Sequence, residues 1–335
     1  MINGHGDDLH CFPNVKINFS TNIFNGFDHS ALFAHLAERL PMVRNYPEPE
    51  PLTLENEIAH THGVEKDNVM ATNGATEAIY LIAQLFRSER TSVLQPTFAE
   101  YADACRVNGI QISNITSLDA ISIADADLVW VCNPNNPTGE VIDKGEILRL
   151  ADTHSQSLFV VDQSYAAYTT QSVIQPQEAC TMNNVMILSS MTKDFGVPGL
   201  RLGYVTAKSN VINQLRHLRM PWSVNSLAIE AGIYLLHHTN EYVINAKALC
   251  EQRQRVAMMM NDMEIETYPS DSNILLCHLP KGDAASLKEY LAMKHGILIR
   301  DASNFYGLDH SHFRIAVQTE EENNELIKAI KEWIG

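Results

Sequence analysis

A single lysine, Lys193, stands among hydroxyl-bearing residues and glycines, directly after a short apolar run. A lysine amine forms a Schiff base with an aldehyde once its pKa is lowered. Ser190, Thr192 and Arg201 lie close by in the sequence and carry donors that suit a phosphate. The alternative is a surface lysine in a loop, where most lysines are found. The spacing and the neighbouring residue types favour the Schiff-base interpretation.

An aspartate and a tyrosine end another apolar run. Residues 158–161 are all apolar, and Asp162 and Tyr165 follow them. A partly buried carboxylate needs a positive partner. A protonated pyridine nitrogen would be one, and the carboxylate would then keep the ring electron-poor. An aspartate that caps a helix is the alternative, and the segment alone leaves both interpretations open.

A stiff loop with two prolines and a glycine, residues 133–139, follows the apolar run that ends at Cys132. Ligands of open α/β sheets bind at such strand ends. The amide of Asn136 could therefore hydrogen-bond a cofactor oxygen. A rigid turn without a ligand is the alternative, and the loop favours the ligand-binding interpretation.

Two further segments could bind a flat, phosphorylated ligand. A helical pattern at residues 76–87 begins with free backbone N–H groups at Ala75 and Thr76, which together with the helix dipole predict an anion site. Simple capping by Asn73 explains the same residues equally well. Phe98 follows another apolar run and could stack on a flat ring, although an aromatic residue there is more often part of the core.

All five segments lie at the carboxyl ends of predicted parallel strands. The strands are apolar, β-branched runs at residues 92–95, 127–132, 158–161, 185–188 and 201–206. Helical patterns at 76–87 and 144–153 separate some of them. The alternation predicts an α/β fold with a mostly parallel sheet sandwiched by helices. Since the carboxyl ends of parallel strands share one edge, the five segments are expected to meet there.

The pattern changes after about residue 221. The predicted helices are 226–237, 241–260, 284–295 and 321–333, and the predicted strands are 273–278, 297–300 and 313–317. This region predicts a smaller α+β domain. We place a large ligand-binding domain at residues 40–225, and a small domain at residues 1–39 and 226–335.

Composition excludes several classes of function. The 335 residues are 45% hydrophobic, which suits about two globular domains. The formal charge of −16 argues against binding to nucleic acid or an anionic membrane. Neither a secretory signal nor a membrane span is recognisable, and the six cysteines form no Cys-x-x-Cys pair, so a cytoplasmic protein without a metal site is predicted.

The order of these motifs resembles the fold-type-I aminotransferase superfamily of pyridoxal 5'-phosphate (PLP) enzymes, close to its histidinol-phosphate aminotransferase branch. The resemblance rests on Gly-Ala-Thr-Glu at 74–77, Asn-Pro-Thr-Gly at 136–139, Asp-x-x-Tyr at 162–165 and Ser-x-x-Lys at 190–193, with Arg201 beyond. It covers nearly the whole chain. It implies a fold-type-I enzyme with a large and a small domain.

The resemblance also assigns roles around the cofactor. Lys193 would bind the PLP aldehyde covalently and later move protons, and Asp162 would pair with the pyridine nitrogen. Asn136 and Tyr165 would contact the ring hydroxyl oxygen, and Phe98 would stack on the ring. The residues implied for the cofactor phosphate are Ala75, Thr76, Ser190, Thr192 and Arg201.

Two more residues extend the resemblance. Tyr46 looks like the residue that reaches the cofactor phosphate of a partner subunit, which implies a homodimer with shared active sites. Arg314 looks like the arginine that clamps a substrate carboxylate, a task that suits its bidentate fork.

Three segments, residues 4–6, 221–225 and 299–308, are similar to threonine-phosphate decarboxylases. Such enzymes act in cobalamin biosynthesis and convert L-threonine O-3-phosphate to (R)-1-amino-2-propanol O-phosphate and CO2. The residues implied around this small phosphorylated substrate are His5, Asn136, Asn225, Arg300 and Arg314. The chain departs from the pattern at Asp7 and Asp8, two acids that suit a phosphate site only if they face away.

Two alternatives remain open. One is an aminotransferase that acts on histidinol phosphate or a related anionic amino acid. The other is a regulatory protein with a PLP-enzyme fold and no activity. The joint presence of Lys193, Asp162, Asn136 and Arg201 favours an enzyme.

Overall fold

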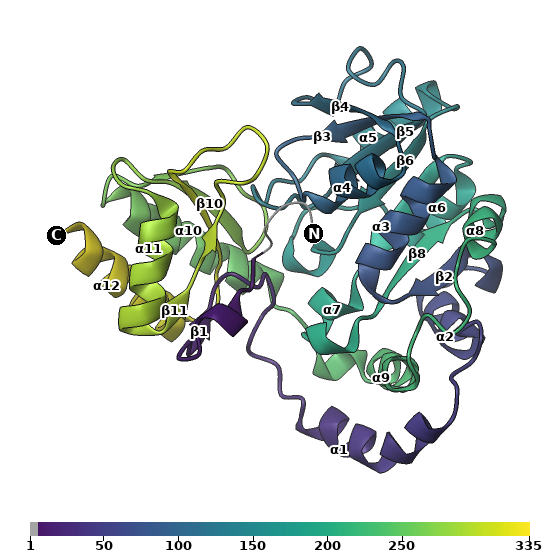
Figure 1. The fold of residues 1–335 in the computed structure, drawn as a ribbon, viewed down its shortest axis with the longest axis horizontal. Helices are drawn as coiled ribbons and strands as arrows, with labels where there is room; N and C mark the ends of the chain where they lie inside the picture. Colours follow the sequence, from purple (N-terminus) through teal and green to yellow (C-terminus); the bar gives the residue numbers. More distant parts are fainter. Residues whose placement is uncertain (1–5) are drawn as a thin grey trace.

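The computed structural model describes residues 6–335, which form a large and a small lobe (Figure 1). The large lobe contains a seven-stranded sheet in the order β2-β8-β7-β6-β5-β3-β4. Its strands are β2 (Val69–Thr72), β3 (Arg90–Leu94), β4 (Gln111–Ile115), β5 (Leu128–Cys132), β6 (Leu158–Asp162), β7 (Val185–Ser189) and β8 (Gly203–Ala207). Strand β8 pairs antiparallel with both neighbours, and the other six strands run in one direction. The prediction of a mostly parallel sheet is confirmed.

Helices cover both faces of this sheet because alternate residues of its strands point to opposite sides. Trp130 and Val160 pack with α3 (Gly74–Leu85) and α4 (Glu100–Val107). Val129 and Phe159 pack on the other face. The second face is covered by α5 (Lys144–Thr153) and α6 (Pro176–Thr181).

A third cluster joins helices at one end of the large lobe. Helices α1 (Ser30–Arg39) and α2 (Leu52–His62) both contact α9 (Ser226–His237), and the cluster includes Leu32, Leu54 and Ile229. The short helices α7 (Met191–Asp194) and α8 (Ser209–Arg216) complete the lobe. The two domains' exact limits, residues 40–225 against 1–39 and 226–335, stay a prediction.

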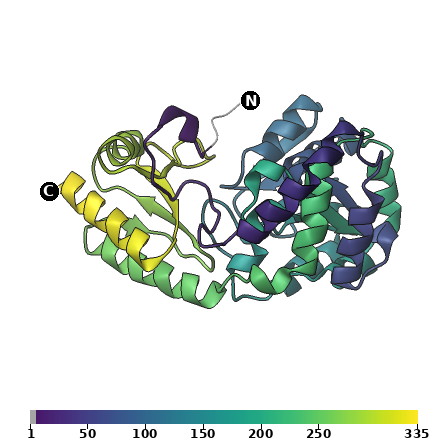
Figure 2. The ribbon, with the colours of Figure 1, turned by 90° about the horizontal axis from the view of Figure 1, so that it is seen from below.

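The small lobe holds a four-stranded antiparallel sheet in the order β12-β13-β10-β9. Its strands are β9 (Glu266–Thr267), β10 (Ile274–His278), β12 (Arg300–Asp301) and β13 (His312–Ala316). Helices α10 (Ala246–Asn261), α11 (Ala284–Tyr290) and α12 (Glu320–Ile334) pack with it. The strand β1 (Ile17–Asn18) pairs with β11 (Ile297–Leu298), so this early part of the described chain joins the small lobe (Figure 2).

The limits of some elements differ from those predicted from the sequence. The predicted helix 241–260 begins only at α10, where the side chain of Asn245 accepts the N–H of Ala248. The predicted helix 284–295 continues beyond α11 as a π-helical segment, Leu291–His295, which ends at Gly296. Arg201 adopts a left-handed conformation, so β8 starts at Gly203.

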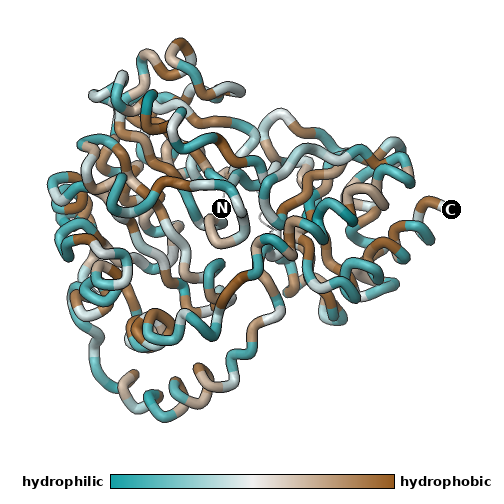
Figure 3. Tube along the Cα trace, turned by 180° about the vertical axis from the view of Figure 1, so that it is seen from behind, coloured by the Kyte–Doolittle hydropathy of each residue, from teal (hydrophilic) through white to brown (hydrophobic). Residues whose placement is uncertain are grey.

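The outer helices alternate between apolar and polar residues along their length (Figure 3), which is the pattern of helices packed on one side. Among residues 6–335, no helix is long and apolar enough to cross a bilayer. The cytoplasmic location stays a prediction.

Candidate active site

Most of the residues singled out in the sequence line one pocket. It lies at the carboxyl edge of the large sheet and takes in residues of β12 and β13 from the small lobe. The predicted residues among its lining are Ala75, Thr76, Phe98, Asn136, Asp162, Tyr165, Ser190, Thr192, Lys193, Arg201, Arg300 and Arg314. The strands bring these residues together because β5, β6 and β7 end level with one another, with Cys132 opposite Asp162.

Lys193 lies in the short helix α7, directly after β7, and its Nζ donates to the carbonyl oxygen of Thr21 at 3.2 Å. Burial, and to a lesser extent the charge of Arg314, lowers the pKa of Lys193 to about 8. A larger share of this amine is therefore neutral and nucleophilic near neutral pH than of an ordinary lysine.

Asp162 ends β6 and is 4% exposed. Its carboxylate accepts hydrogen bonds from the hydroxyl of Tyr101 at 2.6 Å and from the N–H of Ser164 at 2.9 Å. Burial raises the pKa of Asp162, because the loss of hydration outweighs the hydrogen bonds and the charge of Lys193 that favour the negative form. A cationic ring nitrogen would compensate it. The helix-cap alternative is wrong, since the next helical turn, Ala166–Tyr168, has Tyr165 and not Asp162 at its N-cap position.

A group of polar side chains faces the same space. The hydroxyl of Tyr165 accepts from Nδ2 of Asn22 at 3.0 Å, and burial raises the pKa of this tyrosine. Nη1 of Arg314 donates to Oδ1 of Asn136 at 2.7 Å. The amide nitrogen of Asn136 is then left to donate to a ligand oxygen.

Donors for a phosphate converge at the start of α3. This helix begins at Gly74, so Ala75 and Thr76 lie in its first turn. A Cβ atom on Gly74 would lie 2.7 Å from Nη2 of Arg201, which shows how closely the guanidinium approaches the helix start. The buried hydroxyl of Thr192 has no hydrogen-bond partner among the described residues. This donor set fits the phosphate of PLP.

Two buried arginines form the small-lobe wall. Arg300 and Arg314 stand opposite each other on β12 and β13 and are 8% and 3% exposed. Arg300 lies over the ring of Phe305 at 5.3 Å and donates to Oδ1 of Asn304 at 2.6 Å. Nε of Arg314 is buried without a hydrogen-bond partner among the described residues. Burial lowers the pKa of Arg314 to about 9. Two cations in one pocket suit an anionic substrate.

Two described residues that the sequence predicted, Asn225 and Tyr46, are not part of this lining. A third prediction, His5, lies outside the described residues. The side chain of Asn225 caps α9 by accepting the N–H of Ala228 at 2.9 Å. Tyr46 is 84% exposed and packs against Trp222, with ring centroids 5.3 Å apart.

The side chains of Asp7 and Asp8 lie on different sides of the pocket wall: only that of Asp7 lines the pocket. Asp8 faces away and pairs with Lys288. Asp7 lines the pocket, and its carboxylate accepts from Nδ2 of Asn18 at 2.6 Å. The condition that suits a phosphate site, that the acids face away, is therefore met by Asp8 and not by Asp7.

Several pocket residues were not recognised in the sequence. Tyr101 was missed although it hydrogen-bonds Asp162, and Asn22 was missed although it hydrogen-bonds Tyr165. Asn304 and Phe305, which contact Arg300, fall inside the segment 299–308 that was singled out only as a motif. The position of Tyr101 three residues after Phe98 was the available signal.

A second acid beside the lysine gives a stability prediction. Burial raises the pKa of Asp194 to about 7, whereas it is near 3.9 in an unfolded chain. Between these values the folded state binds more protons, so stability falls as the pH rises from about 4 to 7. Asparagine mimics the neutral acid, and we expect Asp194→Asn to raise the free energy of unfolding at pH 8 by about 1–3 kcal/mol. Urea denaturation at pH 4.5 and pH 8 measures this, and an equal effect at both would contradict it.

The fold and the pocket together define a fold-type-I PLP enzyme. Lys193 follows the parallel strand β7, the buried Asp162 ends the neighbouring strand β6, and donors that fit a phosphate lie at the start of α3. The model of the aminotransferase class I and II family matches residues 14–330. The chain therefore belongs to this family, and its cofactor is PLP, as the sequence predicted.

Relatives with two activities resemble the chain. A crystal structure of L-threonine-O-3-phosphate decarboxylase from Porphyromonas gingivalis has a TM-score of 0.92 and 37% identity, covering 95% of this chain and 99% of that one. Histidinol-phosphate aminotransferase of Pyrococcus furiosus is 30% identical over 298 residues, 86% of this chain and 83% of the relative. Threonine-phosphate decarboxylase of Salmonella typhimurium is 28% identical over 335 residues, 95% and 91% of the two chains.

Proposed function

We propose that the protein is a carboxy-lyase that converts L-threonine O-3-phosphate to (R)-1-amino-2-propanol O-phosphate and CO2. The observation that carries this proposal is the pair of buried arginines, Arg300 and Arg314, on one wall of the pocket. A substrate with both a carboxylate and a phosphate would satisfy two cations. The likeness to the decarboxylase of Porphyromonas gingivalis supports the same reaction, and a role in cobalamin biosynthesis stays a prediction.

The residues around the lysine would prepare the reaction. PLP, when bound, supplies an electron sink for the bond that breaks at the substrate Cα. Asp162 would keep a proton on the ring nitrogen of PLP, since its buried carboxylate requires a positive partner. Ala75, Thr76 and Arg201 would hold the phosphate of PLP at the start of α3.

The arginines would decide which bond breaks. PLP, when bound, would weaken the bond of the substrate Cα that is aligned with the π system of its ring. Arg314 and Arg300 would orient the substrate so that its carboxylate takes this position, which would favour loss of CO2. An orientation that places the Cα hydrogen there would favour transamination instead. Orientation of this kind is worth several kcal/mol, up to roughly 7–11. Arg314 is suited to this because Asn136 and the backbone of Ser20 fix its guanidinium.

Product formation requires a proton at the former Cα position. Lys193 and Tyr165 are the candidate donors, because both side chains line the pocket. We expect Tyr165→Phe to lower turnover by about 10²-fold if the tyrosine donates this proton. Unchanged turnover of the variant, measured by amine release, would assign the step to Lys193.

The alternative reaction is transamination of histidinol phosphate, favoured by the relative from Pyrococcus furiosus. The test incubates the holoenzyme with threonine phosphate and no keto acid, and measures CO2 and the amine. We expect stoichiometric release of both. No release, together with 2-oxoglutarate-dependent transamination of histidinol phosphate, would replace the decarboxylase with the aminotransferase.

We also propose that the protein is a homodimer. Large apolar side chains are exposed on α1, on the segment that joins it to α2, at the start of α2 and before α9. They are Phe33, Leu40, Val43, Tyr46, Leu52, Met220 and Trp222. The rings of Tyr46 and Trp222 pack together, and the segment Leu40–Arg44 contacts both α1 and α9. Exposed apolar groups on adjoining segments favour a protein–protein contact. A second copy of the chain would cover them and could bring Tyr46 to the neighbouring pocket.

Mixed dimers test whether Tyr46 acts across subunits. A preparation of Tyr46→Phe and one of Lys193→Ala are mixed, unfolded and refolded together. If Tyr46 serves the partner's pocket, each mixed dimer regains one complete site, so about a quarter of all sites recover. If Tyr46 serves its own chain, or no dimer forms, mixing restores nothing. Sedimentation of the wild-type protein reports the oligomeric state independently.

A further inference from the structure

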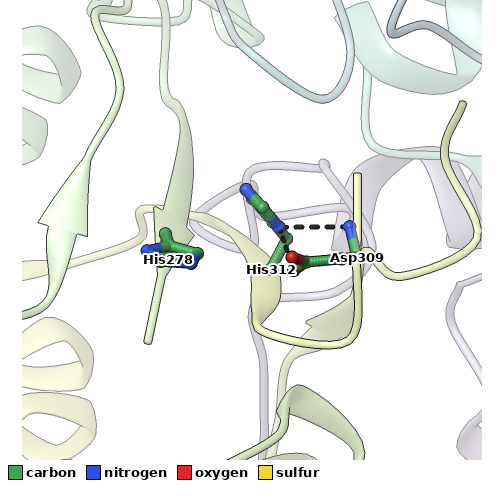
Figure 4. A group of neighbouring side chains, drawn as sticks. All are labelled: His278, Asp309 and His312. Carbon is green, nitrogen blue, oxygen red and sulfur yellow. Dashed lines mark hydrogen bonds and ion pairs between the residues drawn. The ribbon is translucent and has the colours of Figure 1, made fainter. Parts of the chain in front are cut away.

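A second polar cluster lies at one end of the small-lobe sheet, away from Lys193. His278 ends β10 and stands opposite His312 at the start of β13. Asp309 lies in the loop just before β13 (Figure 4). Each of the three offers one ligand atom, and these atoms lie within 4.8 Å of one another.

The geometry around His312 points to a cation. Nδ1 of His312 lies 3.2 Å from the N–H of Asp309, and Oδ1 of Asp309 lies 2.8 Å from the same nitrogen (Figure 4). Without a metal, a protonated Nδ1 donates to this oxygen. In the other tautomer, with the proton on Nε2, the lone pair of Nδ1 and the carboxylate oxygen lie side by side and are both available to one cation.

Partners on the far side of each ring fit a metal site. The hydroxyl of Tyr268 lies 3.0 Å from Nε2 of His312, so it can hold the proton there and leave Nδ1 for a metal. Oε2 of Glu266 lies 3.5 Å from Nδ1 of His278, which leaves Nε2 of that ring. Such outer partners fix the tautomer of metal-binding histidines. Two imidazoles and a carboxylate suit zinc, with water in the remaining position.

The exposure of two of the side chains leaves space for their ligand atoms to approach a metal ion. The side chains of His278 and Asp309 are 34% and 58% exposed, whereas His312 is 9% exposed. His312 therefore provides a fixed ligand, and the other two can rotate toward it. A simple His–Asp contact within a turn would account for the short distance between His312 and Asp309. It would not account for the second imidazole, that of His278 on the neighbouring strand.

We propose that His278, Asp309 and His312 bind one zinc ion, which clamps residues 302–311 onto β10. The same loop carries Asn304 and Phe305, which contact Arg300 in the pocket. A bound metal would therefore restrain one wall of the substrate pocket without entering it. The sequence predicted no metal site, because His278 lies on a different strand, far along the chain from Asp309 and His312.

The test titrates ZnCl2 into tag-free, PLP-saturated protein after removal of metals with EDTA. Calorimetry is expected to show one zinc per chain with micromolar or tighter affinity. Asp309→Asn and His278→Gln should each weaken binding at least about tenfold. His295→Gln is the matched control, because His295 also lies in the small lobe beside an acid, Glu332, but outside the cluster.

Hydrogen exchange provides a second measurement. Zinc should slow exchange in residues 302–311 of the wild-type protein and of His295→Gln, and leave it unchanged in Asp309→Asn. Equal zinc affinity in all four proteins would overturn the site. Zinc-independent exchange in the wild type would overturn the clamp. Both readouts are independent of the reaction that the enzyme catalyses.

Discussion

Replacement of Lys193 by alanine is expected to lower turnover by on the order of 10⁴-fold or more, because the variant loses both its covalent link to PLP and a proton carrier. Purified Lys193→Ala should lack the absorbance band of covalently bound cofactor. Borohydride treatment of the wild type should tag Lys193, identified by peptide mass. Lys281→Ala, an exposed lysine of the small lobe, is the matched control and should retain both properties. A tag on another lysine would contradict the assignment.

The same lysine makes cofactor capture depend on pH. With a pKa of about 8, about 10% of the amine is neutral at pH 7, against about 0.04% for an ordinary lysine. The rate at which the apoprotein captures PLP should therefore rise up to about tenfold between pH 7 and 9 and then level off. A rate that keeps rising up to pH 10 would show that burial does not lower this pKa in solution.

The pocket could be predicted largely because its residues follow apolar strands. Residues 128–132 and 158–161 are continuous apolar runs, and the parallel pairing of these strands places Asn136 and Asp162 at one edge. Strand β4 was missed because it alternates exposed and half-buried residues at the sheet edge. Strand β2 was missed because it is only four residues long.

Contacts between segments that are distant in the sequence could not be predicted from local sequence patterns. Asn22 reaches Tyr165 across 143 positions, and Tyr101 reaches Asp162 across 61. Local patterns report the period of a helix or strand, not the partner that tertiary packing brings to a side chain. Asn225 illustrates the converse, since its place in a motif suggested a substrate contact while its side chain caps α9.

Arg314 is the residue whose replacement should most affect the choice of reaction. Its guanidinium donates to Asn136 and to the backbone oxygen of Ser20, and its Nε has no partner among the described residues. Lysine keeps a positive charge but lacks the planar fork that holds a carboxylate in one orientation. We expect Arg314→Lys to lower kcat/KM for decarboxylation of threonine phosphate by about 10²–10³-fold, as the loss of a buried charged hydrogen-bonding group does.

The loss should come from orientation rather than from folding or cofactor binding. Arg314→Lys should therefore keep the absorbance of bound PLP, and a larger share of its turnovers should end in transamination, measured as pyridoxamine phosphate per CO2 released. Arg255→Lys is the control, because Arg255 bonds Gln252 and Asn324 on the small lobe's helices and does not line the pocket. A variant that loses affinity for the substrate but keeps the same ratio of products would show that Arg314 only binds the substrate. In that case the choice of the broken bond would lie with Arg300 and the residues around it.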